Sequence, residues 1–69
     1  IKYSIPVDGY VTLKIFSAMG EEVRYLINEF KSAGEYEIDF NAGNLTSGIY
    51  FYKIQAGDYE QTKKMILLR

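Results

Sequence analysis

The chain has 69 residues, a formal net charge of −1, and neither Cys nor His. A chain of this length supports one small core, which packing alone must stabilise because no disulfide and no Cys- or His-based zinc site can form. The charge provides no basic surface for nucleic acid or anionic membrane, and no apolar run approaches the roughly 18 residues of a membrane span. We therefore expect one domain over residues 1–69, with no nucleic acid as partner and no membrane insertion.

Apolar and polar residues alternate along most of the chain, which is typical of half-buried β-strands. With the intervening turn residues, this alternation predicts six strands, at residues 1–6, 10–17, 21–27, 35–40, 49–56 and 59–68. Val23 and Leu26 break the alternation in the third segment, which favours a bulged or twisted strand over a helical turn. The predicted fold class is all-β, a small immunoglobulin-like antiparallel β-sandwich of six to seven strands.

Glycines punctuate the predicted strands. We expect structural turns, with positive φ angles, at Gly9, Gly20, Gly34, Gly48 and Gly57. Gly57 and Asp58 alone separate the last two strands, which predicts a tight two-residue hairpin.

Two segments, residues 49–52 and 65–68, are apolar on both faces. A strand of this kind is expected at the centre of a sheet or covered on both sides, because an open apolar edge invites aggregation. Lys63 and Lys64, just before the second segment, are interpreted as gatekeepers against such association.

The residues for catalysis are largely missing. Without His or Cys, neither a His-based triad nor a thiol nucleophile can be built. Carboxylates two residues apart on a strand lie about 6.8 Å apart, as in a glycosidase pair, but a solvated strand face is the favoured interpretation of Glu35, Glu37 and Asp39. We expect no enzyme activity, no catalytic residue and no cofactor.

A metal site is also not expected. Turn residues of the type that binds calcium occur, but no single calcium loop gathers them: Asp8, Asn41, Asn44 and Asp58.

Tyrosine is the one residue type in excess, with seven copies and no Trp. Six of them could form a stacking platform for sugars, which makes a carbohydrate-binding module an alternative function: Tyr10, Tyr25, Tyr36, Tyr50, Tyr52 and Tyr59. Packing within and between strands is the favoured interpretation, because Tyr is a common strand residue.

Several segments, taken in order, resemble a known family. They are residues 1–6, 11–16 and 20–23 with Leu26 in the first half, and residues 33–36, 45–53 and 63–67 in the second. Together they resemble the C-terminal sorting domain, type A, of the type IX (Por) secretion system of the Bacteroidetes and related phyla. The hook-capping flagellar immunoglobulin-like domain belongs to the same broad group and provides a structural alternative.

The resemblance implies an immunoglobulin-like, non-catalytic module at the C-terminus of an exported passenger protein. Its implied partners are the N-terminal passenger domain, the outer-membrane translocon and a sortase-like protease. The implied localisation is the periplasm in transit, and then the cell surface or the medium.

The resemblance also bears on both ends of the chain. The Asn-Pro-rich stretch that family members usually carry before the position of Ile1 is absent. This places the expected cleavage site upstream of Ile1, and a first strand is then missing or supplied by a partner.

We expect the translocon to recognise the last strand, at Lys63, Lys64, Met65, Leu67, Leu68 and Arg69. The alternative is a buried strand that only closes a sheet.

Overall fold

A computed structural model describes residues 1–40 and 43–68. The regular secondary structure of these residues is entirely β-strand. They contain no helix, and therefore no helix that could cross a membrane. The strands are β1 (Lys2–Ile5), β2 (Gly9–Ser17), β3 (Glu22–Lys31), β4 (Gly34–Glu37), β5 (Gly48–Ala56) and β6 (Tyr59–Leu67). The predicted all-β class is confirmed, and each of the six predicted strands has a counterpart.

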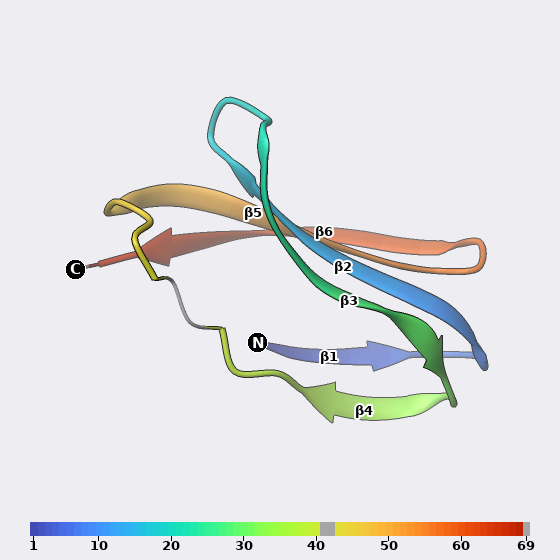
Figure 1. Ribbon diagram of the computed structural model, residues 1–69. Helices are drawn as coiled ribbons and strands as arrows, with labels where there is room; N and C mark the ends of the chain where they lie inside the picture. The colour runs from blue at the N-terminus through green and yellow to red at the C-terminus, as the bar shows by residue number, and fades with distance from the viewer. Residues whose placement is uncertain (41–42, 69) are drawn as a thin grey trace.

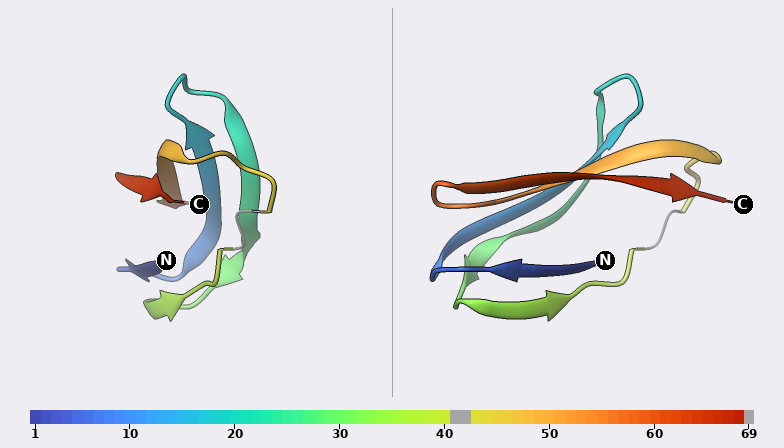
Figure 2. Two further views of the ribbon diagram at one scale, coloured as in Figure 1. Left: turned by 90° about the vertical axis from the view of Figure 1, so that its left-hand side faces the viewer. Right: turned by 180° about the vertical axis from the view of Figure 1, so that it is seen from behind.

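The strands form two antiparallel sheets that pack face to face (Figures 1 and 2). The larger sheet has the order β3-β2-β5-β6, and the smaller sheet pairs β1 with β4. The predicted immunoglobulin-like sandwich is therefore confirmed. The smaller sheet lies across only part of the larger one, so the sandwich is open on the side of β1 and β6 (Figure 2).

The core lies between the sheets and comes mainly from β2. Val11, Leu13 and Ile15 alternate along β2 and are completely buried. The other buried apolar residues are Tyr3 and Ile5 on β1, Ile27 on β3, and Tyr50, Ile54 and Ala56 on β5. Strand β6 adds none to this set, because its inward positions include Gln61 and Lys63.

Strand β3 is bulged where the alternation breaks. Its register against β2 runs from Leu13↔Ile27 to Lys14↔Tyr25, which passes over Leu26, and a second shift passes over Val23. Each bulge inserts one extra residue, so the residues on either side keep their side chains on the correct face. The expectation of a bulged strand at these two residues is confirmed, and no helical turn forms there.

Strand β3 is longer than predicted. It continues beyond Ile27 to Lys31 and pairs with the start of β2. The alternation in the sequence does not reveal this extension, because the apolar and charged residues are on unexpected faces. Phe30 is on the outward face and is 65% exposed, whereas Glu29 is on the inward face, opposite the buried Val11. The Lys31 ammonium lies 3.0 Å from the Glu29 carboxylate, so a local ion pair takes the place of apolar contacts at this end of the strand.

The two strands predicted to be central have different positions. Strand β5 lies between β2 and β6, as expected, but β6 is at the edge of the sheet. The prediction for residues 65–68 was therefore wrong. Their outward side chains face solvent, and Ile66 is 64% exposed. The polar run before them, which ends at Lys63 and Lys64, is the feature typical of an edge strand.

The hairpin between β5 and β6 has the predicted two-residue turn. Ala56 and Tyr59 are paired across it, Gly57 has a φ of +62°, and Asp58 has a negative φ. Positive φ at the first central residue alone is the pattern of a type II′ turn, which matches the twist of the flanking strands. Gly9 differs from expectation, because it is the first residue of β2 and does not have a positive φ.

Candidate recognition surface

The recognition residues predicted on the last strand divide between the two faces of β6. Lys63 is paired with Tyr52 and Lys64 with Phe51 on β5, so the two lysines point in opposite directions. Lys63 faces the open side of the sandwich and Lys64 faces outward. The structure therefore does not bring the two ammonium groups together into one basic patch.

The apolar residues of the segment divide in the same way. Met65 and Leu67 point inward and are half-buried, and Met65 is paired with the buried Tyr50. Leu68 follows the strand and is 85% exposed. Arg69, the last predicted residue of this set, lies outside the described residues. Sequence reasoning missed Ile66, which is paired with Ile49 and belongs to the same outward face as Lys64.

The free edge of β6 presents backbone hydrogen-bonding groups to solvent. A type II′ turn closes with a hydrogen-bonded pair, here Ala56 and Tyr59, and pairs alternate along an antiparallel ladder. The backbone N–H and C=O groups that point away from β5 are therefore those of Glu60, Thr62, Lys64 and Ile66. These groups, together with the outward side chains, make β6 a template for pairing with another strand.

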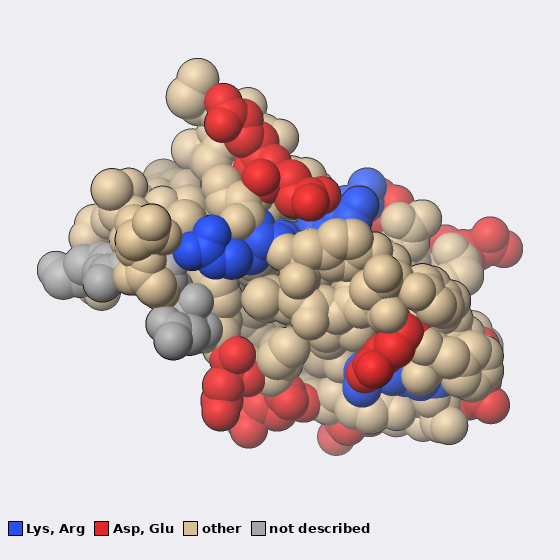
Figure 3. Space-filling model, viewed as in Figure 1, with Lys and Arg blue, Asp and Glu red and all other residues tan. Residues whose placement is uncertain are grey.

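Charges on the outward face of β5 and β6 are mostly paired. Lys53 lies 3.5 Å from the Glu60 carboxylate, and across the sheet Lys14 lies 3.5 Å from Glu22. Among the described residues, Lys64 forms no ion pair. On the face shown in Figure 3, cationic side chains are separated by acidic and uncharged areas, so that face carries no extended basic surface.

The tyrosines do not form a common platform. The Tyr36 ring stacks on Tyr3 between the sheets at a centroid distance of 5.4 Å, whereas Tyr10 and Tyr25 lie on the outward face of the larger sheet. Tyr50 is buried, and its hydroxyl donates a hydrogen bond to the Thr46 carbonyl at 2.8 Å. The rings thus lie on both faces and in the interior, which does not favour the carbohydrate-binding alternative.

The candidate calcium ligands have structural roles or lie apart. The Asp8 carboxylate accepts a hydrogen bond from the Ala33 N–H at 2.6 Å, and the Asn44 side chain accepts one from Arg24 at 3.2 Å. Asn41 is not among the described residues. Within the described part of the chain, no three Asp or Glu side chains lie close enough to hold a metal ion.

The smaller sheet carries the acidic row that was considered for a glycosidase pair. Glu35 and Glu37 are exposed on β4 and are paired with Ser4 and Lys2 of β1. The row is a solvated strand face.

Fold and surface together define a small β-sandwich module with an exposed edge strand. The family model for the secretion system C-terminal sorting domain matches residues 1–68. The chain therefore belongs to this family, the C-terminal sorting domains of type IX secretion. A search of curated proteins found no match, and a search of solved structures found none either.

Membership assigns the general role. The domain is a C-terminal sorting signal that interacts with the type IX secretion system and accompanies an attached passenger protein toward the cell surface or the medium. Sorting domains of this family are generally non-catalytic.

Proposed function

We propose that residues 1–69 act as one sorting and anchoring domain whose last strand the secretion machinery reads by strand pairing. Family membership supports the sorting role. The position of β6 at the edge of the sheet supports the mode of recognition, because an edge strand can accept a further strand through main-chain hydrogen bonds.

The proposed contact surface is the free edge of β6 together with its outward side chains. Lys64, Ile66 and Leu68 are exposed and can contact a receptor while the sandwich stays folded. Met65 and Leu67 point inward, so their role is to hold β6 against the sheet. Arg69 remains a proposed contact of the receptor, and Lys63 belongs to the inward face.

The partners follow from this role. The outer-membrane translocon binds the domain after an N-terminal signal has delivered the passenger to the periplasm. A sortase-like protease then acts upstream of Ile1, and the passenger reaches the cell surface or the medium. The domain itself performs no chemistry in this scheme.

A reporter experiment tests the proposal. A periplasmic reporter carrying residues 1–69 at its C-terminus is expected to reach the surface or the medium of a type IX-competent host. The matched control is the same fusion with Ile66→Lys and Leu68→Lys, which changes the outward face and leaves the inward residues intact. Equal export of the fusion and the untagged reporter would contradict the sorting role. Equal export of the fusion and its control would contradict only the assignment to β6.

A further inference from the structure

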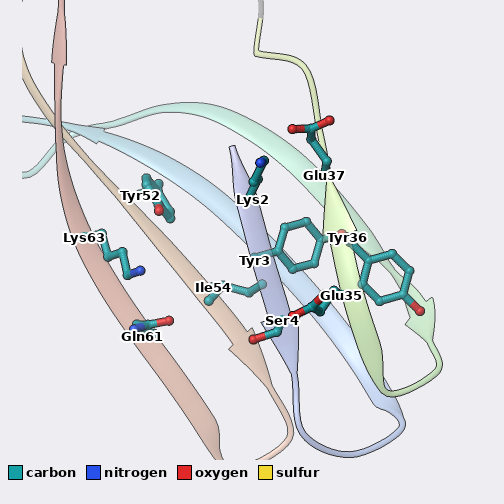
Figure 4. Close-up of a pocket in the computed structure, with 10 residues that line it drawn as sticks. All are labelled: Lys2, Tyr3, Ser4, Glu35, Tyr36, Glu37, Tyr52, Ile54, Gln61 and Lys63. Atoms are coloured by element: carbon teal, nitrogen blue, oxygen red, sulfur yellow. The ribbon is translucent and has the colours of Figure 1, made fainter.

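A groove runs along the open side of the sandwich, between β1 of the smaller sheet and β6 of the larger one. It has a volume of about 530 Å³. One wall consists of β1, and the other consists of Tyr52 and Ile54 on β5 with Gln61 and Lys63 on β6 (Figure 4). The groove is thus bounded by one strand edge from each sheet, a shape that suits an extended segment better than a compact ligand.

The wall formed by β1 offers unpaired main-chain groups. Ile1 and Ile38 exchange two hydrogen bonds, both 2.8 Å long. Because hydrogen-bonded and non-hydrogen-bonded pairs alternate in an antiparallel ladder, the pairs Lys2↔Glu37 and Ser4↔Glu35 are non-hydrogen-bonded. The N–H and C=O groups of Lys2 and Ser4 therefore point away from β4. They present two donors and two acceptors to the groove.

The opposite wall combines apolar and cationic character. Tyr52 is half-buried and Ile54 is buried, and Lys63 follows on β6 as a cation on the inward face. Among the described residues, Lys63 forms no ion pair. The carboxylates that line the groove, Glu35 and Glu37, are on β4, which lies beyond β1 as seen from β6 (Figure 4).

We propose that this groove binds an extended acidic segment of a partner protein, which adds to the free edge of β1 as a third strand of the smaller sheet. The main-chain groups of Lys2 and Ser4 would hold its backbone. Side chains two residues apart on the segment share its inward face. One of them is apolar and contacts Tyr52 and Ile54, and the next is a carboxylate beside Lys63. The charge of Lys63 selects an acidic segment over a basic one.

This site is separate from the outward face of β6 that the proposed function assigns to the secretion machinery. It uses the opposite face of the strand and the edge of the other sheet. The purified domain alone is expected to bind the acidic segment, so this proposal can be tested without an export assay. Failure of either proposal leaves the other standing.

The test uses two synthetic peptides of ten residues with blocked ends. One repeats Val-Thr-Glu-Thr (the Val-Glu peptide) and the other repeats Val-Thr-Lys-Thr (the Val-Lys peptide), so that the Val and the charged side chains share one face of the strand. Each is titrated into the isotope-labelled 69-residue chain, and amide resonances are followed by NMR. The Val-Glu peptide is expected to shift the amides of Lys2, Ser4 and Lys63. The same peptide with N-methyl groups on its Val and Glu residues, and separately on its Thr residues, tests the strand pairing, because these two sets of N–H groups lie on opposite edges of the strand. Methylation of the edge that faces β1 abolishes binding.

Two variants with added negative charge locate the site. Lys63→Glu is expected to weaken the Val-Glu peptide by about tenfold and to reverse the preference in favour of the Val-Lys peptide. Thr62→Glu places a carboxylate on the same strand but on the outward face, and it is expected to change either affinity by less than about twofold.

Three results would overturn the proposal. One is equal binding of the two peptides, and another is an absence of shifts up to millimolar peptide. The third is a dimer of the chain, detected by sedimentation, that the peptides do not dissociate.

Discussion

Lys63 and Lys64 are neighbours in the chain but lie on opposite faces of the same edge strand. Lys63 is paired with Tyr52 toward the groove, and Lys64 is paired with Phe51 toward solvent. A receptor that reads the outward face of β6 can contact the second ammonium group without approaching the first. The two lysines therefore have separable effects, although the sequence presents them as a single basic pair.

The first prediction uses this separation in the export assay. Lys64→Glu is expected to reduce export of a fused reporter several-fold, because it places a carboxylate on the proposed contact surface. The melting temperature is expected to change little, since an exposed charge without an ion pair contributes about 0–1 kcal/mol to folding. Export is measured as the ratio of reporter in the medium to reporter in the periplasm, beside thermal unfolding of the purified domain. Normal export of the folded variant would remove Lys64 from the recognition surface.

A second prediction concerns the core. Ile15 is completely buried on β2, so Ile15→Ala is expected to lower the free energy of unfolding by about 2–5 kcal/mol. The matched control is Ile66→Ala on the outward face of β6, where the side chain is 64% exposed and the expected loss is below about 0.5 kcal/mol. Urea unfolding of both variants measures the difference. Similar losses at the two positions would mean that the faces of the larger sheet are assigned incorrectly.

Much of the fold could be predicted because local pattern and tertiary structure agree. Period-two alternation on β2 places Val11, Leu13 and Ile15 in the core, and the broken alternation at Val23 and Leu26 marks two real bulges. The edge position of β6 was missed for the opposite reason. An apolar run predicts burial on both faces, but its outward side chains, such as Ile66, are exposed in the isolated domain.

The groove could not be predicted from the sequence, because it depends on how the two sheets overlap. Lys2 and Lys63 are far apart in the chain and line the same groove only because the smaller sheet has two strands and leaves the β6 side of the larger sheet uncovered. The reversed pattern at Glu29 and Phe30 has a local cause, since the ion pair between Glu29 and Lys31 replaces the apolar contacts that mark a strand.

A third prediction compares two neighbouring glycines, Gly57 in the turn between β5 and β6 and Gly9 at the start of β2. Gly57→Ala is expected to lower the free energy of unfolding by about 1–2 kcal/mol, because its φ of +62° is unfavourable for a residue with a Cβ atom. Gly9→Ala is the matched control. Gly9 does not have a positive φ, and an added Cβ would lie 4.0 Å from the Gly57 nitrogen, an ordinary contact. Gly9→Ala is therefore expected to be neutral or to stabilise by about 0.4–1 kcal/mol through the unfolded chain. Equal effects of the two substitutions, measured by urea unfolding, would contradict the type II′ turn.

The last prediction is a loss of stability at alkaline pH, caused by deprotonation of Lys31 and of Tyr3, whose ring is stacked on Tyr36. Burial raises the pKa of the Tyr3 phenol above its ordinary value, and a hydrogen bond from the Lys31 ammonium to Glu29 raises the pKa of Lys31. Both groups bind their protons more tightly in the folded chain than in the unfolded one. Their contributions to stability are thus fully present below the unfolded values, about pH 10 for both, and are lost as the pH rises through the folded values.

Urea unfolding at pH 8, 9, 10 and 11 measures this dependence. The free energy of unfolding is expected to be nearly constant up to pH 9 and to fall between pH 10 and 11. Tyr3→Phe keeps the ring stacked on Tyr36 and removes the ionising hydroxyl, so its decline above pH 10 is expected to be shallower than that of the parent chain. Lys31→Arg keeps the positive charge beside Glu29 and does not titrate in this range, so it serves as the matched control for the ammonium. A decline of the same slope in the parent and in both variants would show that other groups cause the alkaline loss. A stability that rises with pH would contradict the direction of both pKa shifts.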